Sequence, residues 1–457
     1  MLVKSISGIR GTIGGRVGEG LNPVDIVRFT AAYATQRRGA IPENNTLVVG
    51  RDARISGQMV DMLVTATLSG MGYHVVNIGL ASTPTTELAV IGEKAAGGII
   101  LTASHNPLQW NALKLLNERG EFLSDTEGKQ VLAIAEKEDF LFAEVTELGL
   151  IEHKDYLPYH IQNVLNLSLV DVEAIRKAGF TVAIDCVNSV GGIAIPALLE
   201  ALGVKTIIPL NCTPDGHFPH NPEPLPKNLT QISELMRDGK ADVGFVVDPD
   251  VDRLAIVCEN GEMFGEEYTL VSVADYVLRH TPGNTVSNLS STRALADVTK
   301  RYGGTYEASA VGEVNVTTLM RKNGAVIGGE GNGGVIYPAS HYGRDALVGV
   351  ALFLSHLAHS GLKTSELRKT YPDYYISKNR IDLTPEMNVD ALLERIKQSY
   401  ANERITTIDG VKIDFADGWV HLRKSNTEPI IRIYSEAASV EQADALAQQI
   451  KDKIAIR

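Results

Sequence analysis

Short apolar runs alternate with longer amphipathic stretches along most of the chain. NTLVVGRDAR (45–54) predicts a strand and a turn, SGQMVDMLVTATLSGMG (56–72) a helix, and YHVVNIG (73–79) the next strand. The same order recurs within 180–210 and within 284–312. Strand, helix and strand at this spacing indicate βαβ units on mainly parallel sheets, and each helix ends in a glycine-containing turn.

The pattern changes near the C-terminus. RITTIDGVKIDFADGWVHLRKS (404–425) predicts consecutive strands joined by Asp-Gly turns, which is typical of antiparallel hairpins. SVEQADALAQQIKDKIAI (439–456) predicts an amphipathic helix with Ser439 as its N-cap. We expect a separate α+β domain here, joined through a polar linker around RKTYPDYYISKNR (368–380).

A chain of 457 residues is too long for one hydrophobic core. The repeated pattern predicts an α/β protein with three related α/β domains and a C-terminal α+β domain. We place these domains at residues 1–150, 151–256, 257–370 and 371–457.

Composition narrows the class of protein. The hydrophobic fraction of 44% and charged fraction of 21% are typical of a soluble globular chain. The net charge of −12 argues against non-specific binding of nucleic acid or anionic membranes. No apolar run is long enough to span a membrane, no secretory signal is evident, and the three cysteines lack metal-binding spacing. We expect a cytoplasmic protein.

The first candidate for chemistry is Ser104, in LTASHNPLQWNALK (101–114), directly after a predicted strand. Loops at the carboxyl ends of strands face the ligand crevice of α/β proteins, so Ser104 is a candidate nucleophile. A turn in which the serine satisfies its own backbone is an equal alternative. A hydrolase triad is disfavoured because His105 is the immediate neighbour of Ser104 and no G-x-S-x-G surrounds it.

Three carboxylates follow another apolar strand in VVDPDVDRLAIV (246–257). Asp248, Asp250 and Asp252 repel one another unless protons or a cation intervene, and Mg²⁺ prefers such oxygen ligands. A polar surface turn is the plainer alternative. A calcium-binding EF-hand is rejected because Arg253 stands at the sixth loop position, where glycine is needed.

Two further loops are candidates for ligand binding. GGEGNGGVIYP (328–338) matches a dinucleotide motif, but a strand-like run follows where that motif needs a helix. Glu330 and Asn332 are instead candidates for binding sugar hydroxyls, with a plain glycine loop as the alternative. RKSNTEP (423–429) offers a guanidinium, hydroxyls and an amide to a phosphate, with a polar hairpin connection as the alternative.

Five motifs in order resemble the α-D-phosphohexomutase family, which covers phosphoglucomutases, phosphomannomutases and phosphoglucosamine mutases. They are SGIRG, TASHNP, DPDVDR, GEGNGG and RKSNTEP. Each motif alone is weak, whereas five in this order and spacing across the whole chain are specific. The resemblance implies four domains around a central active-site cleft.

The resemblance also implies a role for each matching residue. Ser104 matches the serine that carries a phosphoryl group, and Arg10 and Lys114 match basic active-site residues, with Lys114 a candidate proton carrier. One Mg²⁺ per chain is expected on Ser104, Asp248, Asp250 and Asp252. Substrate-binding residues are expected to be Arg253 near the phosphoserine, Glu330 and Asn332 in the sugar loop, and Arg423, Ser425, Asn426 and Thr427 at the non-reacting phosphate.

The sequence departs from the family pattern in the sugar loop. Asn332 stands where the family often has serine, and Gly334 where it has a histidine, so His341 is a candidate substitute in acid–base chemistry. Asn111-Ala112 replaces the usual Asn-Gly before the residue that precedes Lys114. Pro249 and Val251 replace common glycines in the metal loop without removing a ligand.

The implied reaction is a reversible shift of a phosphoryl group between the 1 and 6 positions of a hexose, through phospho-Ser104 and a 1,6-bisphosphate that also serves as activator. Glucosamine phosphate is the expected substrate, with mannose or glucose phosphate as the alternative. A metal-dependent sugar phosphatase and a non-catalytic sugar-phosphate sensor are rival functions. A sensor could lose Ser104 or one of the three aspartates, and this chain keeps all of them, which argues against a sensor. The expected partners are small sugar phosphates, and the expected state is a monomer or homodimer.

Overall fold

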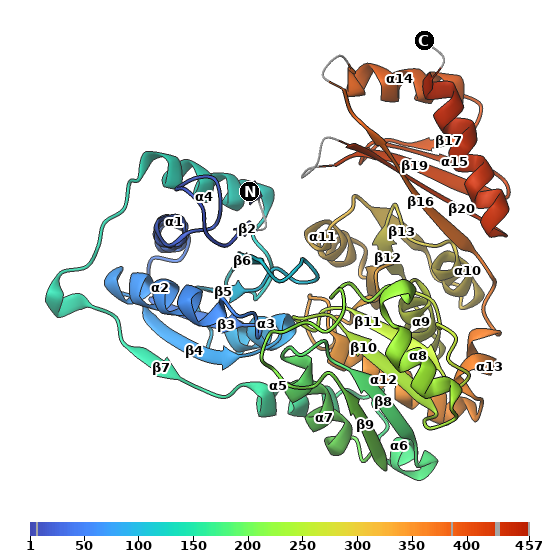
Figure 1. Cartoon of the computed structure of the whole chain (residues 1–457), viewed down its shortest axis with the longest axis horizontal. Coiled ribbons are helices and arrows are strands. Elements are labelled where there is room, and N and C mark those ends of the chain that lie inside the picture. Colours follow the sequence, from blue (N-terminus) through green and yellow to red (C-terminus); the bar gives the residue numbers. More distant parts are fainter. Residues whose placement is uncertain (6–7, 385–386, 426–429, 456–457) are drawn as a thin grey trace. The chain divides into compact units, whose positions relative to one another are not determined.

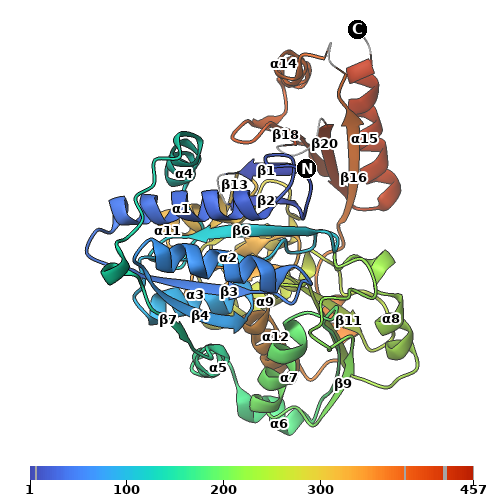
Figure 2. The ribbon, with the colours of Figure 1, turned by 60° about the vertical axis from the view of Figure 1, so that its left-hand side comes forward.

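The computed structural model describes residues 1–5, 8–384, 387–425 and 430–455, shown in Figures 1 and 2. The chain divides into two compact units. Unit 1 comprises Met1–Tyr276 and Asn332–Arg368, and unit 2 comprises Val277–Gly331 and Lys369–Arg457. Each unit is described by itself.

A seven-stranded sheet opens unit 1, in the order β1-β2-β6-β5-β3-β4-β7. Its strands are β1 (Leu2–Ser5), β2 (Gly8–Thr12), β3 (Thr46–Arg51), β4 (His74–Leu80), β5 (Gly97–Leu101), β6 (Trp110–Leu116) and β7 (Ile151–His153). Its helices are α1 (Pro23–Ala40), α2 (Gly57–Gly70), α3 (Thr83–Gly92) and α4 (Asp125–Lys137).

The sheet is mixed, which corrects the expectation of a mainly parallel one. β3 pairs in parallel with β4 and β5, whereas β6 pairs antiparallel with both β5 and β2. The strand that carries the serine loop therefore turns straight back on itself instead of leading into a helix.

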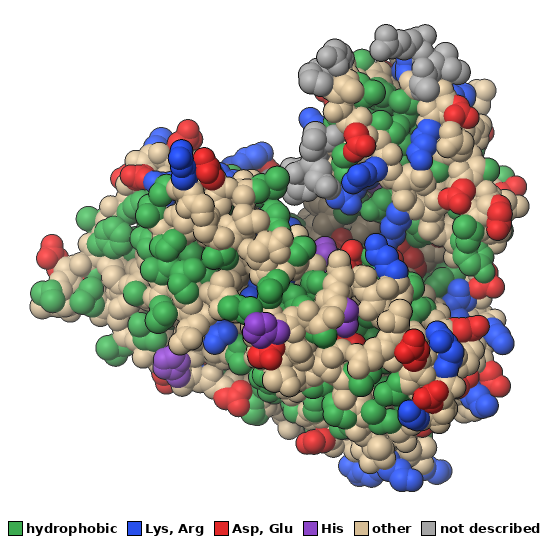
Figure 3. Space-filling view, in the orientation of Figure 1, with side chains coloured by type: hydrophobic (Ala, Val, Ile, Leu, Met, Phe, Trp, Pro, Cys, Tyr) green, Lys and Arg blue, Asp and Glu red, His purple; other side chains and the backbone are tan. Residues whose placement is uncertain are grey.

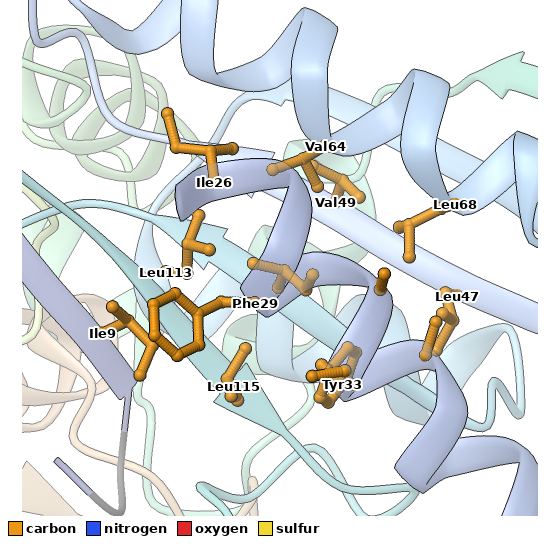
Figure 4. Close-up of a cluster of buried hydrophobic side chains, with 14 of the residues drawn as sticks. Ile9, Ile26, Phe29, Tyr33, Leu47, Val49, Val64, Leu68, Leu113 and Leu115 are labelled. Carbon is orange, nitrogen blue, oxygen red and sulfur yellow. The ribbon is translucent and has the colours of Figure 1, made fainter. Parts of the chain in front are cut away.

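Helices cover both faces of this sheet. A Cβ on Gly97 of β5 would lie 2.3 Å from the Tyr33 hydroxyl of α1, and one on Gly98 would lie 2.7 Å from Cγ2 of Val90 in α3. Neighbouring residues of a strand point to opposite faces, so α1 and α3 pack on opposite sides. Figure 4 shows α1 with Ile26, Phe29 and Tyr33 against strand residues such as Leu113 in a cluster of buried hydrophobic side chains.

Local sequence explains where these helices begin. The side chain of Asn22 accepts hydrogen bonds from the backbone of Val24 and Asp25, and Pro23 occupies the first turn of α1. Ser124 and Glu127 form a reciprocal capping box at the start of α4.

The second sheet of unit 1 has the order β11-β10-β8-β9. Its strands are β8 (Thr181–Asp185), β9 (Thr206–Leu210), β10 (Val243–Val247) and β11 (Leu254–Cys258), and α5 (Leu157–Leu165), α6 (Val172–Ala178), α7 (Gly191–Ala201) and α8 (Thr230–Arg237) are the helices of the same segment. β8 pairs in parallel with β9 and β10, and β11 is antiparallel to β10. The predicted strand, helix and strand within 180–210 are confirmed.

The remaining elements that the structure describes in unit 1 are one short strand, three short helices and two longer helices. They are η1 (Val145–Glu147), η2 (Pro226–Asn228), β15 (Gly334–Ile336), α12 (Ala346–Ser360) and α13 (Thr364–Arg368), and α9 (Tyr268–His280) runs from unit 1 into unit 2. The carboxylate of Asp345 caps the N-terminus of α12.

Unit 2 contains a parallel β/α segment and the C-terminal sheet. The first comprises β12 (Thr285–Asn288), α10 (Ala294–Arg301), β13 (Tyr306–Ser309), α11 (Glu313–Asn323) and β14 (Ile327–Glu330), with β12 parallel to β13 and β14. This confirms the third predicted βαβ pattern.

The C-terminal sheet is antiparallel throughout, in the order β16-β20-β19-β18-β17. Its strands are β16 (Tyr375–Asp382), β17 (Arg404–Thr406), β18 (Val411–Asp414), β19 (Gly418–Lys424) and β20 (Ile430–Ala437), and its helices are α14 (Val389–Ser399) and α15 (Val440–Ala455). The predicted hairpins and the predicted helix are confirmed, and Ser439 Oγ accepts a hydrogen bond from the Gln442 amide. The predicted linker is wrong from Tyr375 onwards because that segment pairs with β20.

Large hydrophobic side chains are exposed in the segment between α4 and β7. Leu141, Val145 and Leu150 are among them, and Figure 3 shows hydrophobic side chains at the corresponding end of unit 1. β7 forms the outer edge of the sheet here.

Among the described residues, no helix combines the length and the apolar character that crossing a membrane requires. The four domain boundaries and the oligomeric state stay predictions.

Candidate active site

Ser104 lies in the connection between β5 and β6, which we call the serine loop (residues 102–109). Its φ is 49°, in the left-handed region that non-glycine residues seldom adopt. Its amide donates a hydrogen bond of 2.9 Å to Oγ1 of Thr102. Ser104 is 8% exposed, so the loop holds a nearly buried hydroxyl in one defined place.

The three aspartates lie between β10 and β11, in a segment that we call the metal loop (residues 248–253). Asp248, Asp250 and Asp252 are fully buried, and a carboxylate oxygen of each lies within 4.8 Å of the other two. The amides of Asp252 and Arg253 both donate to Oδ1 of Asp248, each across 3.2 Å. Val251 adopts a φ of 61°, so this loop also contains a strained non-glycine residue.

The two loops meet within unit 1. Oγ of Ser104 donates a hydrogen bond of 2.7 Å to Oδ2 of Asp248. The imidazole Nδ1 of His105 lies 3.3 Å from the same hydroxyl, and burial, with Arg253 nearby, lowers the pKa of His105 well below its ordinary value. A neutral imidazole leaves the charge around Ser104 to the aspartates and the basic residues.

The chemistry of the aspartates fits a hard divalent cation. Burial, together with repulsion from Asp252 and Asp250, raises the pKa of Asp248 well above its ordinary value. Within the described part of the chain, Oδ1 of Asp250 and Oδ1 of Asp252 are buried without a hydrogen-bond partner. Unpaired buried oxygens are costly, and Mg²⁺ binds such oxygens.

Lys114 returns to the site on β6, where it pairs opposite Ile100 of β5. Its ammonium lies 2.6 Å from Oδ2 of Asp250 and 3.6 Å from Oδ2 of Asp252. Burial lowers the pKa of Lys114, but attraction to these two carboxylates outweighs it and raises the pKa above its ordinary value. Lys114 is therefore an ammonium that can donate a proton or bind an anion.

Thr83 is a site residue that sequence reasoning missed. Its hydroxyl donates a hydrogen bond of 2.5 Å to Oδ2 of Asp250, and its amide donates one of 2.9 Å to the Asp250 carbonyl. Thr83 begins α3, so the start of this helix holds the metal loop. The signal in the sequence was a helix start, Ser82-Thr83-Pro84, directly after a predicted strand.

Arginines surround the aspartates. Arg10 lies on β2, and burial together with repulsion from Arg253 lowers its pKa. Arg344, which sequence reasoning also missed, donates a hydrogen bond of 2.6 Å from Nη2 to Oδ2 of Asp252. A Cβ on Gly334 would lie 2.3 Å from Cδ of Arg344, so Arg344 fills the space beside this glycine. Four cationic side chains therefore suit this site for phosphate groups, namely Arg10, Lys114, Arg253 and Arg344.

His341 is buried between two carboxylates. Its Nε2 lies 3.1 Å from Oδ2 of Asp345, and its Nδ1 lies 3.2 Å from Oε2 of Glu87. His160 reaches the same oxygen of Asp345 at 2.8 Å. Burial lowers the pKa of His341, but the two carboxylates raise it to about 10. Both ring nitrogens therefore face carboxylates, which hold the ring in place, and the acid–base role of His341 stays a prediction.

The sugar-loop residues occur in separate units. In unit 2, Oε1 of Glu330 accepts hydrogen bonds from Nδ2 of Asn288 at 3.0 Å and from the Gly312 amide at 3.2 Å, and Glu330 is 6% exposed. In unit 1, Oδ1 of Asn332 accepts from the Gly334 amide at 3.2 Å.

The predicted phosphate loop follows β19 in unit 2. Arg423 lies directly opposite Arg432 of β20, which lies directly opposite Arg380 of β16. Partners in an antiparallel sheet share a face, so three arginines form a row that we call the arginine ladder. Ser425 is buried and its amide donates to the Ile430 carbonyl, whereas the predicted binding residues Asn426 and Thr427 lie outside the described residues.

Comparisons with protein families match nearly the whole chain. Models described as phosphoglucomutase/phosphomannomutase, alpha/beta/alpha domains I, II and III, match residues 3–142, 158–261 and 265–375. The model of the C-terminal domain of the same family matches residues 380–453. This succession agrees with the predicted class of three α/β domains followed by an α+β domain.

Individual relatives support the same grouping. A phosphoglucomutase/phosphomannomutase of Thermococcus kodakarensis is 38% identical over 95% of both chains. A probable phosphoglucosamine mutase of Methanopyrus kandleri is 33% identical over 98% of this chain and 96% of its own. The structure of a phosphoglucomutase/phosphomannomutase family protein from Burkholderia thailandensis superposes with a TM-score of 0.85 at 25% identity, covering 99% of this chain and 97% of the other.

Proposed function

The chain belongs to the phosphoglucomutase/phosphomannomutase family of α-D-phosphohexomutases and is an isomerase of the intramolecular phosphotransferase class, and from this premise we propose that Ser104 carries the phosphoryl group. The observation that supports this role most directly is the 2.7 Å contact between the Ser104 hydroxyl and Asp248. It puts a nearly buried nucleophile beside three carboxylates that fit a divalent cation.

The reaction begins with phospho-Ser104 and a hexose monophosphate. The bond between phosphorus and Oγ of Ser104 breaks as a bond forms between phosphorus and the free sugar hydroxyl, which gives a hexose 1,6-bisphosphate. The intermediate turns over and its other phosphoryl group returns to Oγ of Ser104, leaving the isomeric monophosphate. Catalysis of this kind depends on positioning and charge stabilisation.

Asp248, Asp250 and Asp252 are the proposed ligands of one Mg²⁺, together with the phosphorylated Ser104. Bound there, Mg²⁺ supplies positive charge beside the transferred phosphoryl group. Arg10 and Arg253 add cationic groups near the same loops. Lys114 carries the proton between the sugar hydroxyl and Ser104, and it starts in the charged form, which suits it to protonate the departing serine oxygen.

Glu330 and Asn332 are the proposed readers of the sugar hydroxyls, and Arg423 and Ser425 are the described members of the grip on the non-reacting phosphate. The arginine ladder supports this grip because it brings three guanidinium groups to one face of the sheet, and guanidinium groups bind phosphate. Asn426 and Thr427 stay predictions for the same grip.

Glucosamine phosphate remains the proposed substrate, with mannose and glucose phosphates as alternatives. The relatives name both kinds of sugar, since one is a phosphoglucomutase/phosphomannomutase and the other a probable phosphoglucosamine mutase. The hexose 1,6-bisphosphate is the proposed activator, because it phosphorylates a serine that has lost its phosphoryl group.

The test is conversion of glucosamine, mannose and glucose 1-phosphates to the 6-phosphates, with Mg²⁺ and a trace of the matching 1,6-bisphosphate. Free phosphate is measured in parallel, and intact mass reports whether Ser104 is phosphorylated. We expect isomerisation with the highest kcat/KM for glucosamine phosphate and little free phosphate. Stoichiometric release of phosphate would identify a phosphatase, and binding without turnover a sensor; either result refutes the proposal.

A further inference from the structure

Arg54 is a fully buried arginine in the turn after β3, and it contacts the serine loop and the residue that follows it. Nη1 donates to the carbonyls of Pro107 and Trp110, each across 2.9 Å. Nη2 donates to the carbonyl of Ser104 and, across 2.7 Å, to that of Asn106. One guanidinium thus binds four backbone carbonyls between residues 104 and 110.

Asp52 orients this guanidinium. Oδ2 of Asp52 accepts a hydrogen bond of 3.0 Å from Nε of Arg54, and Oδ1 accepts one of 3.0 Å from the Arg54 amide. Oδ2 also accepts a hydrogen bond of 2.6 Å from the Thr102 hydroxyl, whose oxygen in turn accepts from the Ser104 amide. Asp52 therefore connects to Ser104 by two routes, through Arg54 and through Thr102.

The same turn is linked to the metal loop through Ser189. The Ala53 amide donates a hydrogen bond of 3.3 Å to Oγ of Ser189, which follows β8. The Ser189 hydroxyl donates a hydrogen bond of 2.7 Å to the carbonyl of Pro249, between the first two aspartates. Residues 52–54 are thus hydrogen-bonded to the serine loop directly and to the metal loop through Ser189.

We propose that Arg54 is a positioning residue that fixes the Ser104 hydroxyl relative to the metal loop during phosphoryl transfer; this inference rests on the function proposed above. Guanidinium has five N–H donors in a planar fork, and here each of the five has its own acceptor: one carboxylate oxygen and four carbonyls. Lysine has three donors on one nitrogen, so it can form at most three of these five hydrogen bonds.

The conformation of Ser104 explains why such positioning matters. A non-glycine residue persists at a φ of 49° only where its surroundings hold it there. Arg54 binds the carbonyl of Ser104, and Thr102 binds its amide. Loss of one of these contacts lets the loop relax and displaces the hydroxyl from Asp248, and a misplacement of about 1 Å costs roughly a hundredfold in rate.

The test compares Arg54→Lys with Arg37→Lys in the full chain. Arg37 is equally buried, on α1, and pairs with Glu118 and Glu127 instead of the serine loop, so it controls for the loss of a buried arginine. We expect Arg54→Lys to lower kcat at least ~30-fold with KM within about threefold of wild type. Arg37→Lys should lower the melting temperature while kcat stays within about threefold.

A second readout separates positioning from general loosening. Each variant is phosphorylated with glucose 1,6-bisphosphate, and loss of the phosphoryl group from Ser104 in buffer without sugar is followed by intact mass. We expect faster loss from Arg54→Lys than from wild type or Arg37→Lys, because a displaced phosphoserine is open to water. If Arg54→Lys does not fold, Thr102→Val replaces it; removal of this hydroxyl should lower kcat about tenfold at unchanged KM.

An Arg54→Lys protein that folds with kcat within threefold of wild type would overturn the inference, as would equal losses of kcat in the Arg37→Lys control. For Thr102→Val, an unchanged kcat has the same meaning. Failure of the proposed function has a different outcome, because wild-type protein would then isomerise none of the three sugar phosphates.

Discussion

The Ser104 hydroxyl donates a hydrogen bond to Oδ2 of Asp248 across 2.7 Å, although 144 positions separate the two residues in the sequence. The contact joins the end of β5 in the first sheet to the end of β10 in the second. It unites a candidate nucleophile with a candidate cation site inside one compact unit. The predictions below follow from this pairing and its neighbours.

Replacing Ser104 by alanine should lower isomerase turnover at least about a thousandfold, because the hydroxyl that we propose to carry the phosphoryl group is lost. Binding of sugar phosphate, measured by calorimetry, should persist. Ser340→Ala is the control, since Ser340 bonds Asn163 and takes no part in the site. Turnover of Ser104→Ala close to wild type would remove Ser104 from the mechanism.

Asp250→Asn should raise the Mg²⁺ concentration for half-maximal rate at least about tenfold, because a neutral amide is a poorer ligand for Mg²⁺. The measurement is initial rate against Mg²⁺ concentration. Asp61→Asn is the matched control, because Asp61 is a partly buried carboxylate on α2 that pairs with Asn77. The same Mg²⁺ dependence in both variants would count against Asp250 as a ligand.

Lys114→Met should bind Mg²⁺ more tightly than wild type while turning over at least about tenfold more slowly. The Lys114 ammonium occupies the same carboxylates that Mg²⁺ needs, at 2.6 Å from Asp250, so its removal ends a competition between two cations. Calorimetric Mg²⁺ titration and initial rates measure the two effects. Lys129→Met, which removes an exposed lysine, should change neither. Weaker Mg²⁺ binding by Lys114→Met would contradict this explanation.

Arg432→Gln should raise KM for the sugar phosphate about tenfold or more with little change in kcat, because a charge-assisted hydrogen bond to phosphate is worth about 1.5–3 kcal/mol. Steady-state kinetics measure the change. Arg404→Gln removes an exposed arginine at the far edge of the same sheet and should leave KM unchanged. An unaltered KM in Arg432→Gln would separate the arginine ladder from the substrate.

His341 should stabilise the fold in a pH-dependent way. Its folded pKa of about 10 lies above the ordinary 6.5, so the stabilisation is fully present below pH 6.5 and is lost as pH rises through 10. The difference in melting temperature between wild type and His341→Gln should therefore shrink across this window. His359→Gln, which removes an exposed histidine, is the control. A difference independent of pH would show that His341 is not a buried cation.

The elements that sequence alone predicted correctly were predictable because hydrophobic periodicity is a local property. The strands around 46–51, 74–80 and 181–185 and the C-terminal hairpins all follow from it. It could not predict that β6 runs antiparallel to β5, since the direction of a short apolar run depends on the turn before it. The segment from Tyr375 was mistaken for a linker because its residues are mostly polar, although it pairs along eight residues with β20.

The site was predictable where chemistry concentrates in a short motif. Ser104 and the three aspartates carry their own signal, whereas Thr83, Arg54 and Arg344 act through contacts with distant segments. An isolated arginine or threonine in a sequence is ordinary, and only the fold shows which oxygen it meets.

The strained backbone at Ser104 and Val251 has a consequence for the order of folding. The φ of each is held in part by a hydrogen bond to a nearby residue, Thr102 for Ser104 and Asp248 for Val251, but the Ser104 hydroxyl meets Asp248 only when the first two sheets have docked. We expect a fragment ending before residue 150 to keep the contacts of Ser104 with Thr102 and Arg54 and yet to lack the carboxylate partner of its hydroxyl. Competence to accept a phosphoryl group would then arise late in folding, after synthesis of the second sheet, so an unfinished chain is protected from premature chemistry.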